Sequence, residues 1–497
     1  MGTFNRNFKN KFIEEIITDI ANNQSSYYIG FGYQNPWDDD YNPPAVNTSI
    51  QTSFYDIHKN LLFGKKVTVS DTAYMTRKIQ WTSNTVYSHY SHLDPDLYNK
   101  DFYIINSDNK VYKCLFNNYG APSTIEPSNI STFGDFDTAD GYKWKFMYGI
   151  KAADYNKFAT SEYIPVFDNS LVRDESENGA IHNIVVSNSG NGYSFSYGTV
   201  DSVLNDKCFK IANSTASSIE DEYNLSTFYV GGSADEGAGI IVDYVVNTSG
   251  KFVFTDRSVN LEPFTNTYSI TPQVLITGDG QDAFAISIAN TLTGGISSIQ
   301  VIDRGLNYTY STTSIIANTL FGSGATAYPI ISPKNGHGSD NQSELGSDVI
   351  GISVATKPAD NLYSWATYRQ VSLLYNPTAY ATTNLFTGAV FKQVLEMDIT
   401  DIYSIMPQGD TVTGLSSGAS GVVLYMDNDK IYVTDIIGEF LQNDIISGSF
   451  SGITCSVIGI NTPDLLPYSA EVFYYRNFQP FTRQDLFSEQ VQLYFKY

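Results

Sequence analysis

The sequence has little cysteine, histidine and positive charge. It contains 3 cysteines and 5 histidines in 497 residues, and 29 basic residues stand against 52 acidic ones, giving a net charge of −23. Cys114, Cys208 and Cys455 lie far apart and form no Cys-x-x-Cys pair. This argues against a disulfide framework or a zinc site and indicates reduced thiols. The negative charge disfavours nucleic acid and anionic membranes as partners, so we expect protein partners.

Long hydrophobic runs are also missing. The most apolar windows are about ten residues long, well short of the roughly 18 to 20 that a membrane-spanning helix needs. The first residues, MGTFNRNFKNKF, lack the apolar core of a secretory signal. We therefore expect no export signal and no membrane span.

Aromatic residues and glycine are abundant. The chain has 37 tyrosines, 30 phenylalanines and 37 glycines, whereas charged residues make up only 16%. This balance favours strands and turns over long surface helices. The length exceeds the roughly 250 to 300 residues at which one core stops growing, so several domains are expected. The predicted class is α+β, mainly β, with an antiparallel core and few helices.

One helix is predicted near the N-terminus, over residues 5–22. Phe12, Ile16 and Ile20 recur at four-residue intervals, and charged residues occupy most of the remaining positions. An apolar stripe with this spacing is typical of an amphipathic helix that packs on a core.

A β-hairpin and a third strand are predicted between residues 101 and 150. Apolar residues alternate on both sides of the turn SDNK, which places Cys114 on one strand face with Tyr112 and Phe116. Residues 140–150 alternate aromatic residues with Lys143 and Lys145, so this strand is expected to pair with the hairpin. We expect the aromatic side chains to pack inward and these two lysines to face solvent.

Two internal repeats interrupt the chain. GAIHNIVVSNSGNGY (179–193) matches GGISSIQVIDRGLNY (294–308), and GDTVTGLSSGASGVV (409–423) matches NDIISGSFSGITCSV (443–457). A strand, a glycine turn and a tyrosine anchor recur in the first pair, and an aspartate and two glycines recur in the second, which predicts inserted β units. The predicted layout is a core built from 1–175, 349–400 and 463–497, carrying insertions at 176–348 and 401–462.

Three patterns raise the possibility of a metal site. Asp38 to Asp40 are consecutive carboxylates, His89 and His92 lie three residues apart, and GDGQDAF (278–284) has the composition of a calcium-binding turn. Consecutive carboxylates cannot all converge on one ion, and the histidines lie in a Ser/Asp/Pro-rich loop without a suitable third ligand. The calcium-like turn occurs as one partial copy. We therefore interpret all three as ordinary loops and predict no metal.

Candidate catalytic residues have structural alternatives as well. Cys114 as a nucleophile would need a histidine base and a pKa-lowering site, and mid-strand placement supplies neither. The loop NGHGSDNQSELG, with His337 beside Asp340, has an enzyme-like composition but also suits a junction after the insert. Pairs of carboxylates could serve glycoside hydrolysis, yet no spacing singles one out. We predict no catalytic residue and no cofactor.

Short motifs outside the repeats occur in a characteristic order. They are IGFGYQNPW, YKCLF, TIEP followed by DGYKW, EYIPV, RQVSLLYNP and SAEVFYYRN. Together they resemble the baseplate wedge subunit of T-even-type contractile-tailed phages, the gene product eight family. Arg476 and Asn477 stand in the opposite order to that family's motif, and the inserts are departures from its plan. The residues that match are Pro36, Trp37, Cys114, Glu126, Pro127, Asp140, Gly141, Tyr142, Trp144, Glu162, Tyr163, Arg369, Gln370, Asn376, Pro377 and Glu471.

This resemblance implies a non-enzymatic virion protein of the tail baseplate, made in the host cytoplasm. It also implies a homodimer packed against other wedge proteins, and we expect the insertions to meet tail-fibre or peripheral baseplate proteins. The matching residues would have structural roles. Two other functions stay open at this point, a tail-associated polysaccharide depolymerase and a glycan-binding module.

Overall fold

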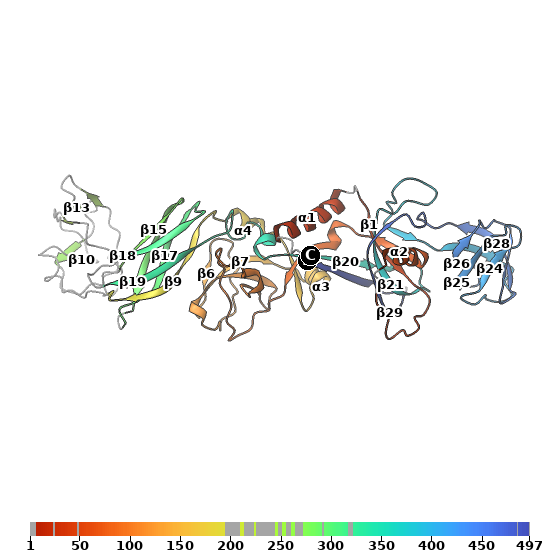
Figure 1. Ribbon diagram of the computed structural model, residues 1–497, viewed down its shortest axis with the longest axis horizontal. Coiled ribbons are helices and arrows are strands. Elements are labelled where there is room, and N and C mark those ends of the chain that lie inside the picture. The colour runs from red at the N-terminus through yellow and green to blue at the C-terminus, as the bar shows by residue number, and fades with distance from the viewer. Residues whose placement is uncertain are drawn as a thin grey trace. The chain divides into compact units, whose positions relative to one another are not determined.

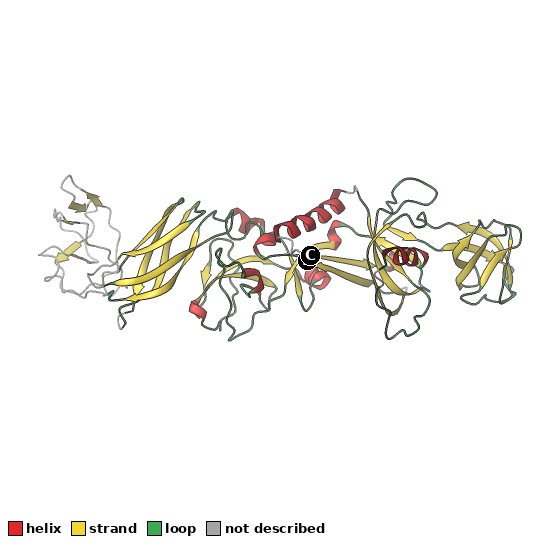
Figure 2. Ribbon diagram, viewed as in Figure 1, coloured by secondary structure: helices red, strands yellow, loops and turns green. Residues whose placement is uncertain are grey.

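The computed structural model describes residues 6–22, 25–46, 49–193, 272–290, 293–316, 322–484 and 486–496, together with short strands between 209 and 263. Cys208 lies outside the described residues. Antiparallel strands predominate and helices are few (Figure 2), which confirms the predicted α+β, mainly β class.

The chain divides into two compact units, which are described separately. The first unit contains residues 1–77, 152–166 and 347–497, and the second contains residues 78–151 and 167–346. Figure 1 shows both units coloured along the chain. The predicted layout placed residues 78–151 with the N-terminal core, whereas these residues cluster with the following segment. The reason is the buried contact between the hairpin and that segment described below.

Strands from both ends of the chain form a five-stranded sheet in the first unit. β1 lies between β2 and β21, so an N-terminal strand is paired on one side with a strand more than three hundred residues away. A core formed jointly by N- and C-terminal segments was predicted and is confirmed. The strand order is β22 (Val390–Lys392), β2 (Leu61–Lys66), β1 (Tyr27–Gly32), β21 (Thr367–Tyr375) and β29 (Glu471–Thr482).

A four-stranded sheet and three helices share this unit. The predicted N-terminal helix is present as α1 (Arg6–Asn22), with Ile13 and Ile20 buried in the core. Phe12, expected on the same apolar stripe, is 40% exposed because it lies at the side of that stripe. The remaining elements are α2 (Ile50–Lys59), α3 (Ala152–Phe158) and the sheet β30 (Glu489–Lys496), β20 (Val349–Thr356), β3 (Thr72–Arg77) and β8 (Tyr163–Val166).

The second sequence repeat folds as a closed six-stranded barrel with its own apolar core. It spans residues 395–461, where the sequence predicts an insert over 401–462. The strand order is β23 (Leu395–Thr400), β26 (Lys430–Ile437), β25 (Ser420–Met426), β24 (Thr411–Gly414), β27 (Ile445–Gly448) and β28 (Thr454–Asn461).

The two copies in the barrel close each other's turns. The Asp444 carboxylate accepts hydrogen bonds from the backbone N–H groups of Ser416 and Ser417, at 2.8 and 2.9 Å. Asp410 accepts the equivalent bonds from Phe450 and Ser451 in the other copy, at 2.8 and 3.0 Å. The aspartate of each copy therefore accepts the backbone hydrogen bonds of a turn in the opposite copy.

The second unit contains the predicted hairpin and its third strand. β4 (Tyr103–Ile105) and β5 (Lys110–Asn117) form the hairpin, and β7 (Tyr142–Gly149) pairs with β5 and with β6 (Phe136–Asp137). The expectation that the lysines of β7 face solvent is wrong for Lys145, which is 3% exposed. Both faces of this sheet are covered, so alternation along the strand does not separate core from surface.

The first sequence repeat forms a six-stranded sheet in the same unit. Each copy provides three strands, and one strand of each copy lies among the strands of the other copy. The strand order therefore reads the same from either edge of the sheet once the two copies are exchanged. Tyr193 N donates to Gly294 O at 2.8 Å, and Tyr308 N donates to Gly179 O at 3.1 Å. The strands are β17 (Ile296–Leu306), β16 (Gln281–Ala289), β15 (Gln273–Gly278), β18 (Ser311–Ile316), β19 (Ser323–Ile331) and β9 (Ile181–Asn191).

Short elements complete the second unit. They are α4 (Ser170–Asp174), α6 (Asn341–Glu344) and the strands β10 (Phe209–Ala212), β11 (Tyr223–Asn224), β12 (Tyr244–Val246), β13 (Lys251–Phe254) and β14 (Asn260–Pro263). Within the described ranges of the chain, no helix combines the length and the apolar character needed to cross a membrane.

Candidate functional site

Arg369 is the centre of the family-motif residues in the first unit. Its guanidinium binds both carboxylate oxygens of Asp40 at 2.8 Å and donates to the Gln34 carbonyl at 2.7 Å. A bidentate arginine–carboxylate pair is strong and fixes orientation. The hydrogen bond from Arg369 holds the pKa of Asp40 below its usual range. Asp40, interpreted from sequence as part of a solvated loop, therefore anchors that loop to β21.

Neighbouring motif residues fix the same region. Trp37 stacks on Tyr33 and donates through Nε1 to the Phe478 carbonyl at 3.1 Å. Gln370 Nε2 donates to Asn477 Oδ1 at 2.8 Å. Through these bonds the loop after β1 is tied to β21 and to β29 near the C-terminus.

In the second unit, Asp140 organises the loop that contains the TIEP motif. Its Oδ2 atom accepts hydrogen bonds from Thr124 N at 2.7 Å, Ile125 N at 2.9 Å and Ser123 Oγ at 3.0 Å. Burial opposes ionisation of Asp140, but hydrogen bonds from Thr138 and these groups hold its pKa below the usual range. The carboxylate thus acts as a fixed internal acceptor.

Glu126 and Pro127 bind this loop to the hairpin. The Glu126 carboxylate accepts bonds from Ser107 N at 2.7 Å and Ser107 Oγ at 3.0 Å, within the turn between β4 and β5. The Pro127 carbonyl accepts a bond from Asn106 Nδ2 at 3.0 Å. Gly141 has a φ of 82°, and a Cβ at this position would lie 2.7 Å from Asn118 Nδ2.

Cys114 lies in the middle of β5, opposite Trp144, and is fully buried. Trp144 is also fully buried and stacks on Tyr142 with a ring separation of 5.5 Å. Burial raises the pKa of the Cys114 thiol well above its ordinary value, which disfavours the thiolate that a nucleophile requires. The environment is that of a core residue.

The other motif residues lie at strand ends. Asn376 exchanges two hydrogen bonds of 2.8 Å with the Ser26 backbone, through its side-chain oxygen and its own N–H. Pro36, Glu162 and Glu471 are exposed. Tyr163 stacks on Tyr494, and Pro377 is buried and accepts a bond from Phe386 N.

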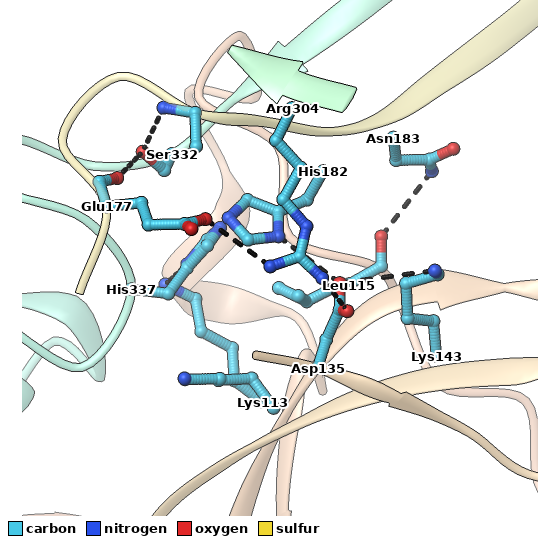
Figure 3. A network of polar contacts seen from close by, with 12 residues as sticks. Lys113, Leu115, Asp135, Lys143, Glu177, His182, Asn183, Arg304, Ser332 and His337 are labelled. Atoms are coloured by element: carbon cyan, nitrogen blue, oxygen red, sulfur yellow. Dashed lines mark hydrogen bonds and ion pairs between the residues drawn. The ribbon is translucent and has the colours of Figure 1, made fainter. Parts of the chain in front are cut away.

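The second unit contains a buried network of charged and polar side chains (Figure 3). Lys113 on β5 is 0% exposed, and its ammonium lies 2.8 Å from Glu344 Oε2 and 2.9 Å from His337 Nδ1. The same ammonium lies 3.9 Å from the centre of the Tyr90 ring. Its three donors are therefore directed at a carboxylate, an imidazole nitrogen and an aromatic face.

A second cluster continues the network toward the six-stranded sheet. Asp135 accepts a bond from His182 Nδ1 at 3.2 Å and forms an ion pair with Arg304. Arg304 also lies 3.3 Å from Glu177 Oε2. The rings of His182 and His337 lie 4.8 Å apart and join the two clusters.

Burial and neighbouring charges control ionisation in this network. Burial lowers the pKa of Lys113, although Glu344 opposes the shift. Burial, reinforced by the positive charge of Lys113, lowers the pKa of His337 well below its ordinary value. Burial also opposes ionisation of Asp135, but the hydrogen bond from His182 and the positive charges of His182, Arg304 and Lys143 hold the pKa of Asp135 at about 2.

The network contains residue types used in acid–base catalysis, but its Lys113 ammonium, its His337 imidazole and its Glu344 carboxylate are closed off from solvent. Lys113, His337 and Glu344 are each at most 5% exposed. A general base must reach the substrate directly or through one water molecule. The arrangement therefore suits an internal electrostatic connection between the hairpin sheet and the six-stranded sheet of the second unit.

The loop residues considered as metal ligands have internal partners. His92 Nδ1 accepts a bond from Ile331 N at 3.1 Å, and the Asp279 carboxylate accepts bonds from Thr309 and Tyr310. Asp340, which lies in the loop of enzyme-like composition with His337, accepts a bond from Ser343 N and caps α6. In the part of the chain that the structure describes, no group of three or more His, Cys, Asp or Glu side chains is placed to hold a metal ion.

Sequence reasoning missed the charged network, although the repeats contain a signal for it. In the 115-residue alignment, His182 corresponds to Ser297 and Arg304 corresponds to Ser189. These two network residues are thus serines in the other copy. The difference in charge between the two copies is the signal that the sequence contains.

Stability of the second unit is expected to fall on mild acidification. The folded-state pKa values of His182 and His337 lie below the ordinary value of 6.5, mainly because of burial. The unfolded state then binds more protons below about pH 6.5, so folding stability is lost as the pH falls from there. The urea midpoint should decrease between pH 7.5 and 5.

The variant His337→Gln separates the contribution of His337 to this pH dependence from the contributions of the other histidines. Glutamine keeps an acceptor for Lys113 and does not titrate, so the midpoint should depend less on pH than in the unaltered protein. Equal pH dependence in both proteins would show that His337 does not contribute.

The sequence matches no known protein-family model and no curated protein. The resemblance to baseplate wedge subunits therefore stays a prediction based on the motifs quoted above.

Proposed function

We propose that this protein is a structural subunit of a phage tail baseplate wedge. The observation that carries the proposal is the role of the motif residues in the fold. Arg369, Asp140 and Glu126 direct their charged groups at other parts of the same chain. A motif that served catalysis or ligand binding would direct such groups into a cavity. Residues that brace loops and strands support a scaffold role.

The composition of the particle tests this proposal. Mass spectrometry of purified phage and of isolated baseplates should find the chain in the baseplate, at two copies for each single-copy wedge protein. Absence of the chain from the particle would refute the proposal. Degradation of host-surface polysaccharide by the purified protein would favour the depolymerase instead.

We further propose that the homodimer forms through α1. A groove of about 870 Å³ runs beside this helix and is lined by Phe12 and Ile16 of α1 and by Ile352, Phe473 and Phe495 of the strands. An exposed apolar groove of this kind is typical of an interface. The groove alone does not identify its occupant.

The charge order along α1 favours a second copy of the same helix. Its first half carries Lys9 and Lys11, and its second half carries Glu14, Glu15 and Asp19. A two-fold axis perpendicular to the helix places two copies of it antiparallel, so the basic half of each would face the acidic half of the other. With the crossing point near Ile13, Lys11 would face Glu15 of the second copy.

A charge exchange tests this arrangement. Lys11→Glu or Glu15→Lys alone would oppose like charges twice in the dimer, and each should weaken dimerisation by about three- to tenfold. Lys11→Glu combined with Glu15→Lys should restore it. Analytical ultracentrifugation gives the dimer dissociation constant.

Circular dichroism of the monomeric protein at high dilution controls for effects on the helix itself. A dimer unaffected by any of these changes would remove α1 from the interface and leave the wedge proposal in place. A protein that is monomeric at all concentrations would refute the proposed homodimer.

A further inference from the structure

The first unit contains a basic pocket in an otherwise acidic chain. Lys65, Lys66, Lys157 and Lys357 line a cavity of about 410 Å³. They come from β2, α3 and the loop after β20, so folding assembles the pocket from three separate parts of the sequence. Four lysines in one pocket are unusual in a chain with 29 basic and 52 acidic residues.

Two of these lysines have carboxylate partners within the protein. Lys65 Nζ lies 2.6 Å from Asp360 Oδ2, and Lys157 Nζ lies 2.9 Å from Asp71 Oδ1. The Asp71 carboxylate also accepts bonds from the Thr68 N–H at 3.0 Å and the Thr68 hydroxyl at 2.6 Å. Asp360 accepts a further bond from Lys357 N at 2.7 Å. Both carboxylates are thus engaged by internal donors.

The pocket has excess positive charge because of Lys66 and Lys357. Lys66 is partly buried and Lys357 is exposed. Over the residues that the structure describes, neither ammonium has a carboxylate within ion-pair distance. Four lysines and Asp71 line the pocket, and Asp360 pairs with Lys65 beside it, so these six side chains have a formal charge of +2, from 4 − 2. Partial enclosure reduces screening by solvent and strengthens attraction for an anion.

We propose that this pocket binds an acidic peptide segment of a neighbouring protein. Its lysines already pair with aspartate carboxylates at 2.6 to 2.9 Å, which is the contact that such a segment would repeat. The volume exceeds that of a single small anion, and Ala355, Thr387 and Ala389 supply the kind of surface against which a peptide backbone packs. The net charge of −23 opposes approach of a long polyanion such as nucleic acid.

The proposal does not depend on the wedge function, because the pocket is a property of the purified protein. The probe is a fluorescein-labelled octapeptide of alternating glutamate and glycine, with a glutamine peptide of the same length as the neutral comparison. Fluorescence anisotropy at low ionic strength should show binding of the glutamate peptide only. Added salt should weaken it, because the contact is electrostatic.

Variants identify the site. Lys66→Glu together with Lys357→Glu should raise the dissociation constant about tenfold or more, since two attractive contacts become repulsive. Lys151→Glu together with Lys496→Glu changes the net charge by the same amount at exposed positions outside the pocket and should leave binding unchanged.

Three results would overturn the proposal. They are equal affinity in both double variants, binding of the glutamine peptide as tightly as the glutamate peptide, and tighter binding of inorganic pyrophosphate or a single-stranded oligonucleotide than of the peptide. The last result would assign the pocket to phosphate chemistry. Because Lys66 and Lys357 are not fully buried, both double variants are expected to fold, and circular dichroism checks this.

Discussion

Replacement of Lys113 by alanine is expected to lower the free energy of unfolding of the second unit by about 3 to 5 kcal/mol. The change leaves the Glu344 carboxylate buried without its cation, since Glu344 is only 5% exposed. It also removes the donor to His337 Nδ1. Urea denaturation gives the overall loss. Hydrogen exchange of β5 and β9, followed by mass spectrometry, should locate the loss in the second unit.

Two comparisons show whether the loss of stability in Lys113→Ala comes from the unpaired Glu344 charge or from lost packing. Lys113→Met combined with Glu344→Leu removes both charges and should recover most of the stability, as apolar replacement of a buried ion pair commonly does. Lys59→Ala removes the exposed partner of Asp435 and should cost less than about 1 kcal/mol. A cost for Lys113→Ala as small as that for Lys59→Ala would contradict the importance of the network.

Gly190→Ala is expected to destabilise the six-stranded sheet by about 3 kcal/mol. Gly190 has a φ of 61°, where a side chain is strained, and an added Cβ would collide with the backbone of Ser323 and Ala325 on β19. The backbone of paired strands cannot move aside without breaking the ladder. Hydrogen exchange in β9 and β19 should report the loss.

Gly324→Ala is the matched control on the same sheet. Gly324 has a φ of 80°, but the nearest atom to an added Cβ is 3.8 Å away, so only the backbone strain of about 1 kcal/mol remains. Gly305, the counterpart of Gly190 in the second copy, has a φ of 59° and would place a Cβ 2.6 Å from Ala283 N. Gly305→Ala should therefore resemble Gly190→Ala, and equal effects of all three changes would refute the clash.

In both sequence repeats, each copy forms hydrogen bonds with the other copy, and this has the same physical consequence in both. In the barrel, Asp410 and Asp444 each satisfy backbone N–H groups in the other copy. In the six-stranded sheet, Tyr193 and Tyr308 each bond to the first glycine of the other copy. A unit of three strands leaves edges unpaired, and pairing with the second copy removes them. Neither copy is expected to fold alone.

The first repeat contains one more pair of matching segments, which the comparison of the two copies in the sequence did not identify. GQDAFA on β16 and GSGATA on β19 occupy corresponding places in the two halves of the sheet. Asp282 and Gly324 both have positive φ there, at 64° and 80°. A six-residue match that replaces glycine with aspartate is weak as a pattern of letters. It becomes clear once the shared backbone conformation is known.

Local patterns in the sequence determined the class of fold, α1, the β4–β5 hairpin with its partner β7, and the two repeats. These features depend on periodicity and turn residues within a few positions of one another, so they can be recognised without knowledge of the rest of the chain. Placement of Cys114 in the middle of a strand belongs to the same group. The role of the motif residues within a baseplate stays a prediction.

Only the tertiary structure decided which polar residues are buried and what neutralises them. Lys113 and Lys145 alternate with their neighbours as surface lysines do, but both are buried. The Lys113 ammonium contacts Glu344 and His337, and the Lys145 ammonium donates to the Thr132 carbonyl. Their environment depends on residues far away in the chain, since Glu344 is 231 positions from Lys113 and Asp40 is 329 positions from Arg369. Alternation along a strand predicts which side chains lie on the same face of the sheet. Whether that face meets solvent is decided by what packs over it.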